Sequence, residues 1–198
     1  MPRPSVREKL LDAGFQLIWR NGYAGTGVRD VVALAGARPG SFTNHFRSKE
    51  DFASEIVDRY GSYVRTVIDD ALSDDGVSGP DRLRRYLDAI TTRLAAASWE
   101  RGCMLGNLCL ETSHHSERLR VALAEIFERW RAPLAACIAD AQAKGEIARR
   151  FDADELADVL LTGWQGAILR MKVTRSPAPL ESFKKIVFTS IFGKDERS

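Results

Sequence analysis

The sequence predicts an all-α fold, on three observations. Apolar residues recur at steps of three and four in nearly every segment, capping and stop residues separate these segments, and no stretch shows the alternation typical of a β-strand. Of the 198 residues 44% are hydrophobic and 28% are charged, which is the balance of a globular chain rather than a disordered one. We therefore expect a bundle of helices.

The first two helices have clear boundaries. Ser5 and Glu8 form a capping box at the start of the first helix, and Asn21–Gly22 supplies its stop signal. A second helix should follow Thr26, whose hydroxyl can cap it, and end at Gly36. Each helix has one apolar face, so the two can pack against each other.

A third short helix is expected after a tight turn. Pro39 can open it, because a residue in the first turn of a helix needs no N–H donor. Phe42 and Phe46 stand at i and i+4 and should anchor it from behind. Its outward positions then carry short hydrogen-bonding side chains: Ser41, Thr43, Asn44 and His45.

The rest of the chain also has a helical pattern. Ser48 should cap a longer helix that ends near Ser73, and the turn formers up to Asp81 predict a loop. Further apolar helical patterns cover about 82–98, 103–113, 116–144, 153–174 and 180–192. Pro133 should kink or interrupt the pattern that contains it.

Composition limits the functional classes. Residues 1–47 carry seven arginines and lysines against three carboxylates, which suggests an anionic partner for this part of the chain. The most apolar uncharged stretch, Val159–Leu169, is far shorter than a membrane helix requires. We expect a cytoplasmic protein without a membrane segment, metal or cofactor. No nucleophile motif, paired carboxylates, phosphate loop or metal-ligand spacing predicts a catalytic site.

Helices joined by only Gly36-Ala37-Arg38 are typical of a helix-turn-helix. In that arrangement the later helix enters the major groove of DNA and its polar side chains reach base edges or phosphates. The alternative is a three-helix corner of an ordinary bundle. Pattern alone leaves both interpretations open.

Residues 6–57 resemble the N-terminal domain of the TetR family of transcriptional repressors. The resemblance rests on an apolar first helix followed by Phe15, Asn21-Gly22-Tyr23, Thr26, Val28, Asp30-Val31, Ala35-Gly36, Gly40-Ser41-Phe42, Phe46 and Ser48-Lys49-Glu50. It implies a helix-turn-helix domain at 1–50, joined by a long helix to a helical ligand-binding and dimerisation bundle at 51–198. Family members typically bind palindromic operators as homodimers and release them when a small molecule binds.

The resemblance and the pattern together give a set of DNA-contact candidates. These are Thr26, Arg38, Pro39, Gly40, Ser41, Thr43, Asn44, His45 and Lys49. Thr43 stands where the family usually has a tyrosine that contacts the DNA backbone, and Arg38 with Pro39 replaces a small capping residue and a lysine. The operator sequence and phosphate contacts can therefore differ from the family's. Arg3 is better interpreted as a solvated surface arginine.

A second resemblance concerns Gly102-Cys103-Met104-Leu105-Gly106-Asn107, which is similar to a Gly-Cys-x-x-Gly-Asn stretch in a TetR subgroup that senses electrophiles and oxidants. A cysteine at the start of a helix favours the thiolate, so Cys103 is a candidate sensing thiol; the alternative is a buried, inert core residue. Candidate effector-lining residues are Trp99, Cys103, Met104, Leu105, Phe127, Trp130, Trp164 and Met171, each of which could equally be ordinary core.

The last two helical patterns suit self-association, with small residues on one and an apolar stripe on the other. The candidates are Gly163, Gly166, Ala167, Phe183, Val187 and Ile191. The alternative is that these faces close the core of the monomer. We expect a homodimeric, effector-responsive repressor of double-stranded DNA; the competing interpretations are an activator of the same fold, a helical enzyme that binds a small molecule, and an interaction protein without DNA affinity.

Overall fold

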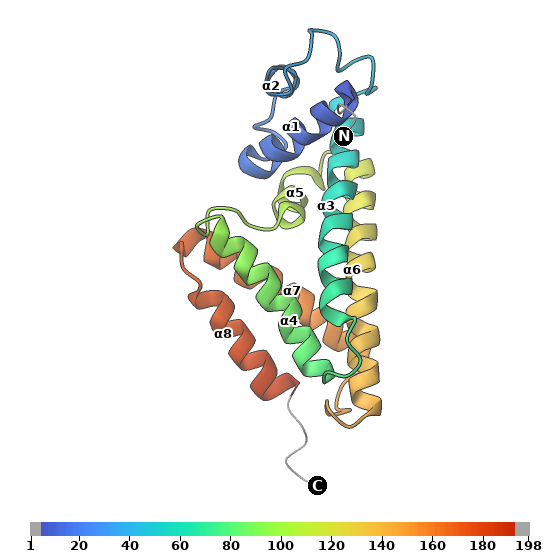
Figure 1. Ribbon diagram of the computed structural model, residues 1–198, viewed down its shortest axis with the longest axis vertical. Helices are drawn as coiled ribbons and strands as arrows, with labels where there is room; N and C mark the ends of the chain where they lie inside the picture. Colours follow the sequence, from blue (N-terminus) through green and yellow to red (C-terminus); the bar gives the residue numbers. More distant parts are fainter. Residues whose placement is uncertain (1–4, 193–198) are drawn as a thin grey trace. The chain divides into compact units, whose positions relative to one another are not determined.

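The structure, a computed structural model, describes residues 5–192 of the chain, so Arg3 lies outside the described part. The predicted all-α class is confirmed. The helices are α1 (Val6–Asn21), α2 (Val28–Leu34), α3 (Lys49–Leu72), α4 (Gly79–Ala96), α5 (Met104–Thr112), α6 (Glu117–Ala143), α7 (Ala153–Thr174) and α8 (Ala178–Ile186), and α8 continues into a π-helical segment, η1 (Val187–Ile191) (Figure 1).

Two compact units divide the chain, and they do not follow chain order. Within the described residues, the first comprises the chain up to Ser62 together with Met104–Ile126, and the second comprises Tyr63–Cys103 with the chain from Phe127 onward. The first unit therefore contains α5 and the first turns of α6 in addition to the N-terminal helices. The domain boundary expected at residue 50 follows chain order, whereas each compact unit combines segments that are far apart in the sequence.

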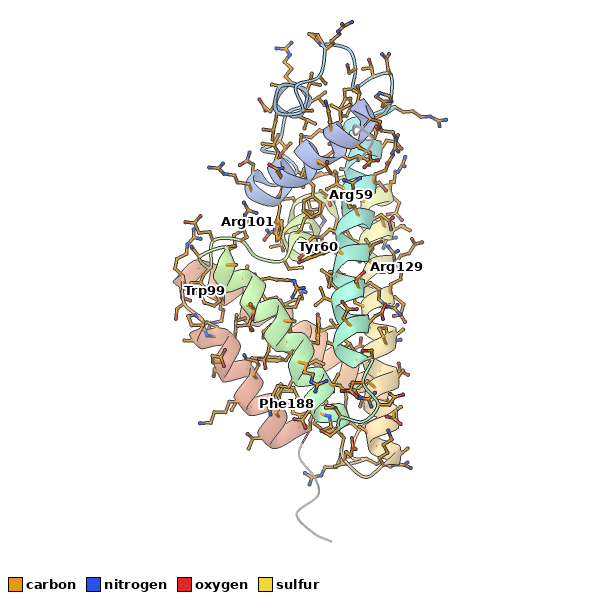
Figure 2. All side chains as sticks on the ribbon, viewed as in Figure 1. Arg59, Tyr60, Trp99, Arg101, Arg129 and Phe188 are labelled. Carbon is orange, nitrogen blue, oxygen red and sulfur yellow. The ribbon has the colours of Figure 1, made fainter. Side chains whose placement is uncertain are left out.

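The first unit is built around close approach of α1 to α3. Gly14 makes this possible, because a Cβ atom there would lie 2.1 Å from Cζ of Phe52. On the outside of the same pair, Arg59 of α3 reaches the carboxylates of Glu8 and Asp12 of α1, both at 2.6 Å (Figure 2). A buried apolar contact and an exposed ion-pair network thus hold the two helices together.

The start of α2 corrects one expectation. Thr26 does not cap this helix, because its hydroxyl donates to the carbonyl oxygen of Gly22 at 2.7 Å. Gly27 is the N-cap residue instead, and its N–H donates to the carboxylate of Asp30 at 3.2 Å. Thr26 therefore stabilises the turn that leaves α1.

The segment expected to form the third short helix is a series of turns. Gly40 has φ of +86°, which lies outside the right-handed helical region. Backbone bonds from Ser41 N to Arg38 O and from His45 N to Phe42 O, each at 3.0 Å, span three residues as in a tight turn, and a single bond from Phe46 N to Phe42 O at 2.9 Å spans four. We call residues 38–47 the reading segment.

In the second unit, α8 packs against α7 and α4 (Figure 1). Gly163 of α7 receives the ring of Phe183, since a Cβ atom at residue 163 would lie 2.4 Å from that ring. Arg82 of α4 is buried and pairs with Asp140 of α6 at 2.6 Å. Apolar contact joins α7 to α8, and a charged pair joins α4 to α6.

Pro133 does not break its helix, one of the two outcomes expected for it. α6 is continuous from Glu117 to Ala143 with Pro133 inside it. A proline removes the N–H that would bond the carbonyl four residues earlier, here that of Arg129. Arg65 of α3 donates to that carbonyl at 3.0 Å.

None of the helices within residues 5–192 has both the length and the hydropathy that crossing a membrane requires.

Candidate DNA-binding site

The reading segment presents a polar rim over an aromatic base. Phe42 and Phe46 are buried, and with Phe52 they form a cluster whose ring centroids lie 4.8 to 5.2 Å apart. The intervening side chains point outward: Arg38, Pro39, Gly40, Thr43, Asn44 and His45 are exposed, and Ser41 is half-buried. Spacing alone predicted this division, although the backbone is turned rather than helical.

Internal hydrogen bonds limit what some of these side chains can offer to DNA. The hydroxyl of Thr43 donates to the carbonyl oxygen of Gly40 at 2.9 Å. Its oxygen keeps free lone pairs, so it can still accept a hydrogen bond from a base. Asn44 and His45 sit beside it on the exposed rim. Of the short polar side chains, Asn44 and His45 therefore remain the most open candidates for a contact with a base.

Lys49, the expected phosphate contact, lies at the start of α3. Its Nζ sits 4.3 Å from the centroid of the Tyr23 ring, an arrangement that orients the ammonium group. Partial burial lowers the pKa of Lys49, and the nearby carboxylate of Glu111 opposes that effect. The Tyr23 ring is itself half-buried, so Lys49 is held in place before any DNA arrives.

The structure does not bring Thr26 to this surface. It is 2% exposed and its hydroxyl is already bonded within the turn, so Thr26 is not accessible to DNA. The DNA-contact candidates chosen from the sequence do not include two arginines that the structure shows to be exposed, Arg29 in the first turn of α2 and Arg47 at the end of the reading segment. The positive charge of residues 1–47 was the available signal, but charge alone does not say which arginines face outward.

The candidate effector-lining residues are largely buried. Met104 and Leu105 belong to the first unit, and the other six belong to the second. Trp99 and Phe127 are half-buried and the remainder are buried. Within the second unit the rings of Phe127 and Trp130 meet edge to face with centroids 5.6 Å apart, and Trp164 packs on Phe183 at 5.8 Å.

Cys103 directly precedes α5 and is 7% exposed. It lies close enough to the hydroxyl of Tyr86 to raise the pKa of that group, although burial is the larger cause of the shift. Cys137 is buried too, and burial raises the pKa of its thiol. Of the three cysteines Cys109, in α5, is the most accessible.

The candidate dimerisation residues divide into two groups. Gly163 and Phe183 contact each other, and Ala167 and Val187 are 7% and 2% exposed, so these four contribute to the core of the monomer. Gly166 is exposed and Ile191 is half-buried. Other apolar side chains of α7 and α8 are open to solvent: Val159, Leu169, Val173 and Ile186.

The polar reading segment lies between α2 and α3 on a phenylalanine cluster, with arginines and a lysine around it, which is the side-chain arrangement of a helix-turn-helix DNA-binding domain even though the backbone of this segment is turned. Residues 10–56 match the family model described as bacterial regulatory proteins, tetR family, and residues 79–187 match the tetracyclin repressor-like C-terminal domain. The chain belongs to the TetR family of transcriptional regulators. It is therefore a regulator rather than a member of an enzyme family.

Similar proteins support this assignment along the whole chain. The HTH-type transcriptional repressor DhaR of Mycobacterium sp. (strain GP1) is 39% identical over 99% of this chain and 97% of its own length. A crystal structure of a TetR regulatory protein from Rhodobacter sphaeroides has a TM-score of 0.85 at 33% identity, covering 91% of this chain and 95% of that one. The reduced form of Escherichia coli NemR has a TM-score of 0.84 at 27% identity, covering 97% and 100%.

Proposed function

We propose that this regulator is a repressor that binds a palindromic operator as a homodimer in the cytoplasm and leaves it when a small molecule or a thiol modification acts on the helical body. The observation that carries the proposal is the exposed rim of Asn44 and His45 above the buried phenylalanine cluster. A rigid apolar base fixes the positions of short polar side chains, which is what base readout requires. Arg38, Arg47 and Lys49 supply positive charge for the phosphates.

Selection from random-sequence DNA tests this proposal. The recovered duplexes should share a two-fold symmetric motif with half-sites about 34–36 Å apart. Asn44→Ala should weaken binding of the recovered duplex by about 1–3 kcal/mol, while Thr92→Ala, an exposed change on α4, should not. Binding should weaken steeply with salt because phosphate contacts release counterions. Failure to enrich any sequence would contradict the proposal.

The homodimer is supported by an apolar stripe on α7. Val159, Gly166, Leu169 and Val173 recur at steps of seven, three and four, which places them on one face of the helix. Leu169 is 51% exposed and Val173 is 78% exposed. At Gly166 no described atom outside the neighbouring backbone of α7 itself lies within 4 Å of the position a Cβ would take, which leaves room for a helix of a second copy. Two-fold pairing through this stripe would match the symmetry of the operator.

The class of effector is suggested by Trp164. This residue is 1% exposed, and its indole N–H finds no acceptor among the described residues. A buried donor without a partner costs about 1–3 kcal/mol, which an acceptor on a bound molecule would recover. We infer that the effector is a small molecule with an acceptor oxygen, such as a carbonyl or ether, that accepts from Trp164.

Thiol modification at Cys103 is the second route of release. Support comes from its place directly before α5 and from the resemblance of its sequence context to a sensing subgroup. Burial opposes it, because an electrophile must reach the sulfur. Cys103→Ala should abolish release by N-ethylmaleimide, whereas Cys109→Ala should not. Equal release in both variants would remove Cys103 from the mechanism.

Whether the bound protein represses or activates is a separate test. Transcription in vitro from a promoter that carries the selected site should fall when the protein is added. A rise in transcription would favour the alternative interpretation, in which the protein is an activator.

A further inference from the structure

Three side chains from the junction of α5 and α6 contact the DNA-reading part of the chain, inside the same compact unit. They are Glu111 in α5, Ser116 between the helices and Arg118 in the first turn of α6. Their partners lie in the loop between α1 and α2 and at the start of α3, on either side of α2 and the reading segment. The contacts are polar, and each involves a charged group or a buried hydroxyl.

Arg118 acts on the end of the reading segment through Asp51. Nη2 of Arg118 lies 2.5 Å from Oδ1 of Asp51, and the other carboxylate oxygen accepts the backbone N–H of Arg47 at 3.3 Å. The backbone N–H of Asp51 in turn donates to Ser48, which caps α3. The Arg47 N–H and the Arg118 guanidinium lower the pKa of Asp51, so the carboxylate is charged at neutral pH. Arg118 thus restrains the group that fixes the backbone of Arg47.

Ser116 makes a second contact to α3. Its hydroxyl donates to Oε1 of Glu50 and accepts the backbone N–H of Leu119 at 3.1 Å, which makes it the N-cap of α6. It is 8% exposed, so water competes little for this hydroxyl. One side chain therefore begins α6 and ties it to the start of α3.

Glu111 holds the opposite end of the helix-turn-helix. Its carboxylate accepts the backbone N–H of Ala24 at 3.1 Å, across 87 residues of chain. Gly22 leaves room for it, because a Cβ atom there would lie 2.2 Å from Oε1 of Glu111. The backbone of Gly22, with φ of +79°, also suits glycine. The corner that leads from α1 into α2 is thus shaped around a carboxylate from α5.

We propose that Arg118 and Glu111 are positioning residues for operator binding, which set the orientation of the reading segment without touching DNA. The inference rests on the proposed function. Two anchors at the two ends of a short element restrain its direction, so loss of either should reduce discrimination between DNA sequences more than it reduces non-specific attraction. Non-specific affinity depends mainly on total charge.

Arg118→Ala and Arg120→Ala form a matched pair that tests the proposal in the full chain. Both remove one positive charge from the first turns of α6, but Arg120 pairs with Glu117 of the same helix at 2.6 Å. The measured quantity is the ratio of affinities for the selected duplex and for a scrambled duplex of the same composition. We expect Arg118→Ala to lower this ratio about tenfold, equivalent to about 1.4 kcal/mol, and Arg120→Ala to leave it within about twofold.

A double-mutant cycle separates positioning from a direct DNA contact. If Arg118 acts through Asp51, then Arg118→Ala combined with Asp51→Ala should lower the ratio no further than the more damaging single change. Additive losses would overturn the route through Asp51. An unchanged ratio in Arg118→Ala would overturn the proposal for Arg118. Failure of the unmodified protein to prefer any duplex would instead refute the proposed function.

Glu111 provides a second test that does not depend on how Arg118→Ala folds. Glu111→Gln keeps an oxygen that can accept from Ala24, whereas Glu111→Ala removes it. We expect the glutamine variant to retain the affinity ratio and the alanine variant to lower it several-fold. Equal ratios in the two variants would overturn the role of Glu111.

Discussion

Arg65 of α3 donates from Nη1 to the backbone carbonyl oxygen of Arg129 at 3.0 Å, and this carbonyl stands four residues before Pro133, which has no N–H to offer it. Both residues belong to the second unit, and Figure 2 labels Arg129 on α6. Nε of the same guanidinium pairs with Asp69 one turn further along α3, at 2.8 Å. A side chain of one helix thus replaces a backbone bond missing from another.

This relationship predicts that the effect of Arg65 on stability depends on Pro133. Arg65→Ala should lower the free energy of unfolding by about 1 kcal/mol, because the Arg129 carbonyl loses its donor. In a Pro133→Ala background residue 133 supplies that donor, so the same change should cost clearly less. Urea unfolding of the four proteins measures both values.

Asp69→Asn is the control for this cycle, since it removes the ion partner of Arg65 and keeps the bond to Arg129. Asp69→Asn should lower the free energy of unfolding by the same small amount whether residue 133 is proline or alanine. An equal cost of Arg65→Ala in the two backgrounds would show that the bond to Arg129 does not compensate for the proline.

Local signals in the sequence predicted most of the fold. Ser5 is the N-cap of α1 as expected, since its hydroxyl accepts the N–H of Glu8 at 3.2 Å, and the helix expected to begin after Ser48 does begin at Lys49. The carboxylate of Glu8, the other half of the expected capping box, pairs with Arg59 at 2.6 Å. These features involve residues three or four apart, so sequence displays them directly. The continuity of α6 did not follow in the same way, because the donor that accommodates Pro133 comes from another helix.

At the candidate site, too, the sequence predicted local features but not contacts made by residues far along the chain. The spacing of apolar and polar residues correctly predicted that Phe42 is buried and that Asn44 is exposed, because this pattern involves only neighbouring residues. It did not identify Glu111 or Arg118, which reach the helix-turn-helix from far along the chain. Nor did it distinguish the apolar residues of α7 that pack on α8 from those that face solvent, because a helix with two apolar stripes has no obvious outer face.

The exposed stripe of α7 predicts which substitutions disrupt the proposed dimer. Leu169→Glu and Val173→Glu should each weaken self-association by about 2 kcal/mol, or about thirtyfold, by placing a charge in an apolar contact. Sedimentation velocity should show a shift toward monomer. Leu110→Glu is the matched control, since Leu110 of α5 is 75% exposed and lies off this stripe. Dimers that persist in both α7 variants would contradict the assignment.

The charge on Asp51 predicts a pH dependence of stability. Its pKa in the folded protein is below the ordinary value of 3.8, owing to the Arg47 N–H and to Arg118. A depressed carboxyl pKa contributes stability that is present above the unfolded-state value and is lost as pH falls through the folded-state value. The difference in unfolding free energy between the unmodified protein and Asp51→Asn should therefore be constant near neutral pH and shrink below about pH 4. A difference that grows on acidification would contradict this account.

The unpartnered indole of Trp164 predicts how an effector is recognised. Of the four tryptophans in the sequence, Trp164 is the one whose indole nitrogen is buried without an acceptor in the described part of the chain. In a protein labelled with ¹⁵N-tryptophan, its indole signal can be assigned by its loss in Trp164→Phe. Cyclohexanone, which carries a carbonyl acceptor, should move that signal downfield, and methylenecyclohexane, of similar shape, should not.

Trp164→Phe should keep most of the buried ring contacts and remove only the donor. We therefore expect it to fold and to bind the selected duplex normally, and to bind carbonyl-bearing effectors more weakly by about 1–3 kcal/mol, because their oxygen enters the protein without a partner. Isothermal titration with any compound found to release the duplex measures this loss. An effector that binds both proteins equally well would show that the indole N–H is satisfied by something other than the effector, such as an internal water.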